Sequence, residues 1–203
     1  YYQKVIELEP DNFDAHINIG ACLRNKNELK KAIKFFKTAI KINPNYGPIY
    51  DNLGVCLRDT GDQLSAIKSF EKAIQKQPDY VEAYLNLGNT LLDIGRVVEA
   101  VEFFAKAIQT LPMNSRIINS MGTAQKYLGD LAGALISFDK AIHFDFENKE
   151  ALLNRSMTYL HLGNFKSGWP EYEWRQKVKK FPFEPLATSK PEWTPSVVSG
   201  RVL

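Results

Sequence analysis

The chain has 203 residues, of which 44% are hydrophobic and 24% are charged, a composition typical of folded domains. Its formal net charge is +3, and the segment from Asn164 onward, with seven Lys or Arg and four Asp or Glu residues, holds the whole excess. The residues before it are electrically balanced, which argues against the basic stripe of a nucleic-acid-binding array. No apolar run approaches the roughly 18 residues that a membrane span needs, so we expect neither nucleic acid nor a membrane as partner.

The chain opens in the middle of a structural pattern. Its first residue is Tyr1 rather than Met, and residues 1–12 read as the end of a helix that closes at Pro10, because proline cannot continue a helix. We therefore expect a piece of a longer protein that begins with a truncated repeat. No signal peptide is recognisable at its start.

Residues 13–148 contain four units with a period of 34 residues. The recurring positions are Gly20, Gly54, Gly88 and Gly122; Ala32, Ala66, Ala100 and Ala134; Phe36, Phe70, Phe104 and Phe138; and Pro44, Pro78 and Pro112, with Pro10 one period before them. A 34-residue period is typical of helix-turn-helix solenoids. The turns are expected at Asn27, Gly61, Gly95, Gly129 and Gly163, since these residues tolerate the left-handed conformation that ends a helix.

The unit 81–114 shows how each repeat packs. Small residues such as Gly88 and Ala100 let its two helices approach closely, and Phe104 fills the seam between them. One unit cannot bury this seam alone, so neighbouring units must stack. The sequence therefore predicts an elongated all-α solenoid.

The same unit resembles the tetratricopeptide repeat (TPR) family. It carries the family's aromatic start, Leu-Gly pair, Ala-x-x-x-Phe second half and closing proline at Tyr84, Leu87, Gly88, Leu91, Ala100, Phe104 and Pro112. The resemblance implies a right-handed superhelix whose concave groove binds a protein or an extended peptide.

Two cysteines, Cys22 and Cys56, lie one period apart. A disulfide needs Cα atoms within about 7 Å, whereas neighbouring helices lie about 8 to 10 Å apart. We therefore expect free thiols, both buried in the small helix slot that Thr90 fills one unit later. Reduced thiols favour a cytoplasmic location.

The pattern weakens in residues 149–180, a divergent fifth unit or cap, and the composition changes again in residues 181–203. All three Trp residues and five of the ten Pro residues lie at or after Trp169. One interpretation is a capping helix followed by a Pro- and Trp-rich tail or linker that covers the last apolar face, because repeat arrays need such a cap.

A second interpretation of this segment rests on resemblance. The run GWPEYEWR from Gly168 to Arg175, followed by Pro191, Trp193 and the closing residues 200–203, resembles the junction at which bacterial TPR proteins continue into a glycosyltransferase-like domain. On this interpretation any catalytic domain lies beyond the chain.

The sequence shows no pattern for catalysis, a metal ion or a cofactor. His16, His143 and His161 have no partners at ligand spacing, and the repeated Leu-Gly pair lacks the Gly-rich turn after a strand that a phosphate loop requires. We therefore expect that this chain is not an enzyme.

One polar position recurs in the first helix of the units. It holds Asn18, Asn52, Asn86 and Asn154, with Ser120 as the exception. These side chains either brace neighbouring helices or line the groove, where an amide offers both a donor and an acceptor to the backbone of an extended peptide. The column resembles the asparagine ladder in the TPR region of O-linked N-acetylglucosamine transferases.

Three cations share another position of the first helix. Arg24 and Arg58 lie one period apart, and Lys126 takes the same position later. They either bind an acidic side chain of a ligand or stay solvated or paired within the chain, with Asp51 or Asp59.

These observations predict a protein-interaction scaffold that holds a partner protein or an extended peptide in its groove. The alternative is the substrate-recognition arm of a larger TPR-containing glycosyltransferase. Neither the oligomeric state nor the identity of the partner follows from the sequence.

Overall fold

The computed structural model describes residues 2–178, and for Gln3, Gln176 and Lys177 it describes the backbone alone. Within this range the chain forms α-helices, one short 3-10 helix and no strand, which confirms the all-α prediction. The elements are α1 (Tyr2–Leu8), α2 (Phe13–Asn25), α3 (Leu29–Ile42), α4 (Gly47–Asp59), α5 (Gln63–Lys76), α6 (Val81–Asp93), α7 (Val97–Thr110), α8 (Ser115–Leu128), α9 (Leu131–Phe144), α10 (Lys149–His161), α11 (Phe165–Tyr172) and η1 (Glu173–Lys177).

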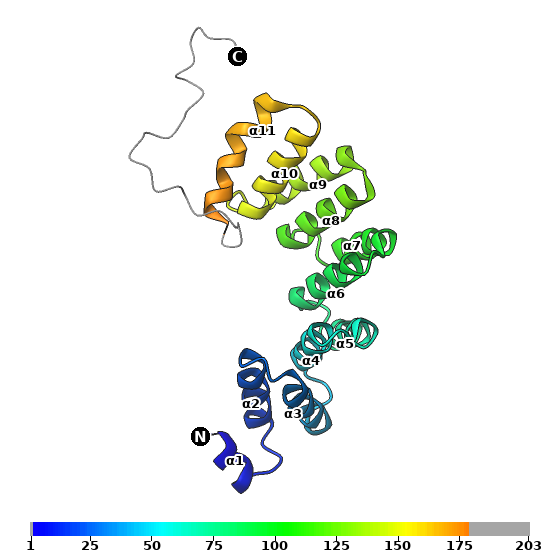
Figure 1. Ribbon diagram of the computed structural model, residues 1–203. Coiled ribbons are helices and arrows are strands. Elements are labelled where there is room, and N and C mark those ends of the chain that lie inside the picture. Colours follow the sequence, from blue (N-terminus) through cyan, green and yellow to red (C-terminus); the bar gives the residue numbers. More distant parts are fainter. Residues whose placement is uncertain (1, 179–203) are drawn as a thin grey trace, which may run out of the picture.

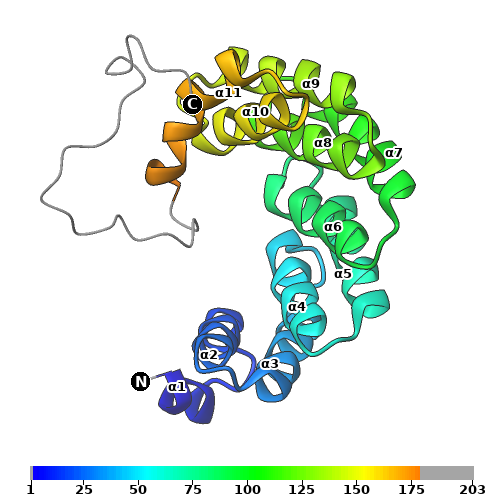
Figure 2. The same ribbon diagram turned by 45° about the horizontal axis from the view of Figure 1, so that its top comes forward.

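From α2 onward the helices pair into hairpins that stack along the chain (Figure 1). Each even-numbered helix packs against the helix that follows it and against the next even-numbered helix. Figure 2 shows that the stack bends into an arc, with α2, α4, α6, α8 and α10 along its concave side. The helices that carry the asparagine column therefore line the concave face.

The seam inside each hairpin is built from one repeated contact. Phe36, Phe70, Phe104 and Phe138 are fully buried. Each ring lies against the Gly of the preceding helix, so that a Cβ added at Gly54 would lie 2.5 Å from the Phe70 ring. Such a distance is far inside van der Waals contact, which explains why this position holds Gly.

The turns within the hairpins follow the expected backbone geometry. Asn27 has a φ of 60° and Gly61 has a φ of 88°, both in the left-handed region that ends helices. Before several of the inner helices an Asn side chain accepts a hydrogen bond from the first turn, as Asn12 does from the Ala15 amide at 2.9 Å. These caps satisfy backbone donors that the helix itself leaves unpaired.

The prediction that both cysteines are buried is wrong for Cys22. Cys56 is buried and Cys22 is exposed, and both thiols are free. The equivalent residues Thr90, Ala124 and Thr158 are also buried. Only the short helix α1 precedes α2 within residues 2–178, so no inner helix lies where it would cover Cys22.

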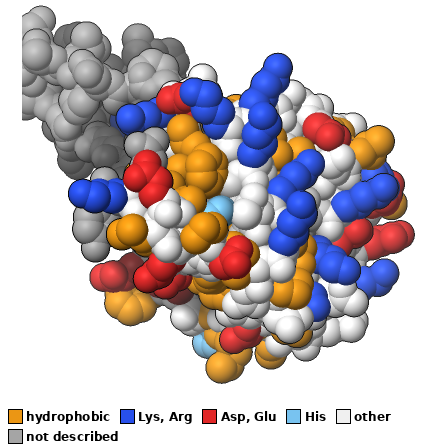
Figure 3. Space-filling model, turned by 90° about the horizontal axis from the view of Figure 1, so that it is seen from below, with side chains coloured by type: hydrophobic (Ala, Val, Ile, Leu, Met, Phe, Trp, Pro, Cys, Tyr) orange, Lys and Arg blue, Asp and Glu red, His pale blue; other side chains and the backbone are white. Residues whose placement is uncertain are grey.

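Charge is unevenly distributed over a solenoid that is nearly neutral as a whole. Helix α3 carries five lysines and no acidic residue, at Lys30, Lys31, Lys34, Lys37 and Lys41. Figure 3, which looks at the N-terminal end, shows many Lys and Arg side chains over one side of this end. The charge of this outer helix is separate from the mixed charges of the groove.

The structure describes only part of the C-terminal segment for which the sequence makes predictions. Residues 149–178 form α10, α11 and η1, whereas residues 179–203, with the Pro- and Trp-rich tail, lie outside the described residues. None of the described helices is both long and apolar enough to cross a membrane.

Candidate functional site

The asparagine column lies along the concave face. Asn18, Asn52, Asn86 and Asn154 stand on α2, α4, α6 and α10, and all four are half-buried. Ser120 takes this position on α8 and is half-buried as well. A period of 34 residues therefore places one polar side chain of this column on each inner helix.

Arginines of one repeat bind asparagines of the next. Arg24 Nη1 donates to Asn52 Oδ1 at 2.7 Å, and Arg58 Nη1 donates to Asn86 Oδ1 at 3.4 Å. Arg58 also lies 3.4 Å from the Asp59 carboxylate. Both arginines that the sequence suggested for ligand binding thus take part in contacts within the solenoid.

A second polar position completes this network. Asn86 Nδ2 donates to Asp51 Oδ1 at 2.8 Å, and Asn154 Nδ2 donates to Asn119 Oδ1 at 3.0 Å. In both pairs the partners are 35 residues apart, on consecutive inner helices. Asn86 and Asn154 therefore brace neighbouring repeats, and a search of the sequence for polar residues 35 apart would have found these pairs.

Asp51 is an acidic group in the floor of the groove. It is only 6% exposed, and burial raises the pKa of its carboxyl, while the hydrogen bond from Asn86 and the charges of Arg24 and Arg58 work in the opposite direction. Burial, followed by the charge of Asp51, raises the pKa of Tyr80 to about 12. The middle of the groove is therefore poorly solvated.

Further along the groove, Glu82 and Lys126 differ in their surroundings. Arg116 Nη1 donates to Glu82 Oε1 at 2.7 Å, which links α8 to α6 and holds the pKa of Glu82 below its ordinary value. Lys126 has no ion-pair partner among residues 2–178, and burial lowers the pKa of its ammonium group. Of the three predicted cations, Lys126 is thus the one that the described groove leaves unpaired.

A cavity of about 280 Å³ opens on the C-terminal half of the concave face. It is lined by Asn89, Asn119, Ser120, Thr123, Glu150, Leu153, Asn154 and Val178. Most of these side chains are polar and uncharged, so the cavity can offer donors and acceptors to a bound amide. Within the described range, His, Cys, Asp and Glu side chains form no cluster that could hold a metal ion.

Three segments of the chain match known repeat families. A family described as Tetratricopeptide repeat matches residues 13–46, a second family with the same description matches residues 81–110, and the family described as TPR repeat matches residues 56–95. Among curated proteins, none matches the chain in sequence.

Several solved structures share the fold. YrrB, described as a TPR protein with an unusual peptide-binding site, is 21% identical over 85% of this chain and 89% of its own, with a TM-score of 0.61. MamA is 22% identical over 78% of this chain and 93% of its own, with a TM-score of 0.63. The pilF protein of Pseudomonas aeruginosa is 20% identical over 81% of this chain and 75% of its own, with a TM-score of 0.69. At these identities the likeness establishes the fold alone.

Proposed function

Because the chain folds as an all-α solenoid of tetratricopeptide repeats, we propose that its concave groove binds an extended segment of a partner protein. The repeat families and the TPR neighbours support a protein-interaction role, and YrrB is described as having a peptide-binding site. The observation that carries the proposal is the column of half-buried asparagines along the groove, one on each of α2, α4, α6 and α10.

The bracing contacts leave these amides with capacity for a ligand. Asn52 accepts from Arg24 through its oxygen and donates one N–H to the Pro48 carbonyl at 3.1 Å. An asparagine amide has two N–H donors and an oxygen with two lone pairs, so one donor and one lone pair remain. The braces also fix the side chain in place, which lowers the entropy cost of binding.

Other groove residues have no internal partner. Asn18, Asn89 and Ser120 make no side-chain hydrogen bond within the described residues. A bound peptide presents a donor and an acceptor on nearly every residue. The groove would therefore hold the peptide backbone with little regard for its sequence, and Lys126 would add a preference for an acidic side chain nearby.

Removal of the three unpartnered groove residues tests this proposal. The variant Asn18→Ala, Asn89→Ala, Ser120→Ala keeps every bracing contact, so we expect it to fold as the wild type does. If each side chain donates or accepts one hydrogen bond worth about 0.5 to 1.5 kcal/mol, each loss weakens affinity by about 2- to 10-fold. Binding of a library of extended peptides, measured by fluorescence anisotropy, reports the change.

A matched variant separates groove contacts from general effects on the surface. Gln75 and Gln109 lie exposed on the outer helices α5 and α7, at equivalent repeat positions, so Gln75→Ala, Gln109→Ala should bind as the wild type does. Equal binding by the groove variant and this control would refute the groove proposal. Circular dichroism of all three proteins checks that they fold alike.

The glycosyltransferase alternative rests on sequence resemblance. Of its marks, the run from Gly168 to Arg175 spans the end of α11 and the start of η1, whereas Pro191, Trp193 and residues 200–203 lie outside the described residues. We propose it as the second function because the groove would then select protein substrates for a catalytic domain in the same protein. The coding sequence beyond Leu203 tests it, and an unrelated continuation would exclude it.

A further inference from the structure

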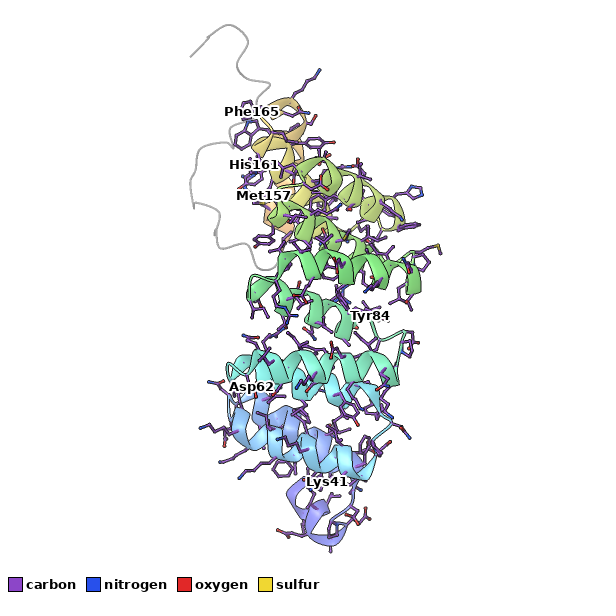
Figure 4. All side chains as sticks on the ribbon, turned by 90° about the vertical axis from the view of Figure 1, so that its right-hand side faces the viewer. Lys41, Asp62, Tyr84, Met157, His161 and Phe165 are labelled. Carbon is purple, nitrogen blue, oxygen red and sulfur yellow. The ribbon has the colours of Figure 1, made fainter. Side chains whose placement is uncertain are left out.

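The last hairpin has an open apolar side. Phe165 and Trp169 on α11 are 59% and 53% exposed, and we call these two residues the end face. Figure 4 labels Phe165 at the C-terminal end of the solenoid, and Phe165 and Trp169, four residues apart on α11, share one face of that helix. Exposed apolar side chains that gather in one place indicate a binding surface.

The repeat register explains what the end face lacks. Trp169 occupies the repeat position of Ile67, which is only 8% exposed and shares an apolar cluster with Tyr84 and Leu87 of the next inner helix. Phe165 occupies the position of Leu29, which packs against a cluster that contains Ile49 and Tyr50 of the next inner helix. In the earlier repeats the next inner helix therefore covers these positions. Within the described residues no inner helix follows α11, so Phe165 and Trp169 stay uncovered.

We propose that residues 181–193 of the same chain cover the end face. They follow Val178, which lies beside Glu150 near the start of α10, after only two residues. At about 3.3 Å for each extended residue, the eight residues from Val178 to Leu186 span up to about 26 Å, more than the distance of about 8 to 10 Å between packed helices. They include apolar side chains at Phe181, Phe183, Leu186 and Trp193.

The apolar residues of this segment also keep the register of the inner helices. Leu186 lies one period after Leu152, which is buried on α10, and Trp193 lies one period after the half-buried Tyr159. Pro191 lies between these points and Pro185 directly precedes them, and proline in a helix interior removes a backbone donor and disfavours the helix. The segment thus supplies the side chains of a following inner helix without the sequence of a sixth repeat.

A covalent link favours this segment over a second copy of the chain. A short tether gives the segment an effective concentration in the millimolar range, so that even a weak apolar contact stays occupied. A second copy would have to reach that concentration in solution. The proposal concerns the end of the solenoid and is independent of peptide binding in the groove.

Photo-crosslinking of the full chain tests the proposal. Trp193 is replaced by the photoreactive residue p-benzoylphenylalanine, and the crosslinked peptides are identified by mass spectrometry. We expect crosslinks within one molecule to residues 157–169. Crosslinks between two molecules would assign the end face to a second copy, and crosslinks to α2–α8 would place the segment in the groove. Either result, or no crosslink at all, would overturn the proposal.

Two variants of the crosslinking protein make the result specific. Phe165→Asp, Trp169→Asp places charges on the end face, and we expect the crosslink yield to fall at least tenfold. Leu64→Asp, Ile136→Asp changes two residues of similar exposure, 67% and 70%, on α5 and α9, and should leave the yield unchanged. If the first variant fails to fold, the crosslink map of the parent protein still decides between the occupants. Equal yields from two folded variants would refute the contact.

Discussion

The seam and the groove of this solenoid follow the same 34-residue period but differ in how much their residues vary from repeat to repeat. In the seam, Phe36 and Phe70 meet Gly20 and Gly54 in the same way, and the contact recurs in later hairpins. In the groove, the position held by Asp51 becomes Leu85 one period later and Asn119 after two. The seam is therefore nearly identical from repeat to repeat, whereas the groove changes its chemistry along the array.

The seam contacts stabilise the fold, whereas the groove side chains can vary and change what the groove binds. Every repeat from residue 13 to 148 keeps the same Phe and Gly pair, whereas the fifth hairpin has Tyr172 and the buried Ser156 at these positions. Groove side chains need only support one another across the next helix, as Asn86 and Asp51 do at 2.8 Å. Different pairs can fill this role, and each leaves a different set of donors and acceptors for a ligand.

We expect the largest loss of stability when a buried Phe of the seam is replaced. Phe104→Ala removes a fully buried ring and leaves a cavity against Gly88, so we expect a loss of about 3 to 5 kcal/mol in the free energy of unfolding. Urea unfolding followed by circular dichroism measures it. The control Phe146→Ala changes a ring that is 77% exposed and should cost about 0.5 kcal/mol or less. Similar losses in both variants would contradict the role of the seam.

The seam could be predicted from the sequence because one residue type fills each of its positions. Gly at the position of Gly88 and Phe at the position of Phe104 recur without exception from residue 13 to 148, and the packing follows from that spacing. The positive φ at Asn27 was predictable in the same way. Such features depend on one repeat and its copies.

The groove contacts could not be predicted as directly. Arg24 reaches Asn52 over 28 residues, and Asn86 reaches Asp51 over 35, so the partners depend on how far one repeat is rotated against the next. The sequence left both bracing and ligand binding open for the asparagines, and the structure shows the braces. The exposure of Cys22 was missed for a related reason, since burial of this position depends on a preceding inner helix, and within residues 2–178 only α1 precedes α2.

A smaller effect is expected when a brace in the groove is removed. Asn86→Ala takes away the donor to the buried Asp51 carboxylate and the acceptor of Arg58. A buried polar group that loses its partner costs about 1 to 3 kcal/mol. Asn18→Ala is the matched control, because Asn18 has the same repeat position and no side-chain partner within residues 2–178. Urea unfolding should show a loss for Asn86→Ala alone, and equal stability of both variants would mean that the brace contributes nothing.

The smallest effect concerns the pH dependence of the groove floor. Burial raises the pKa of Asp51, so the folded protein binds this proton more tightly than the unfolded chain does. The corresponding stability is present below the unfolded pKa and is lost as the pH rises through the folded value. Asp51→Asn keeps an acceptor for Asn86 but cannot ionise. We therefore expect the free energy of unfolding of this variant, relative to that of the wild type, to increase as the pH rises from about 3 to 7. Urea titration at each pH measures both values. A constant difference would mean that Arg24, Arg58 and Asn86 offset the burial of the carboxylate, and the groove floor would then accept a charge as readily as water does.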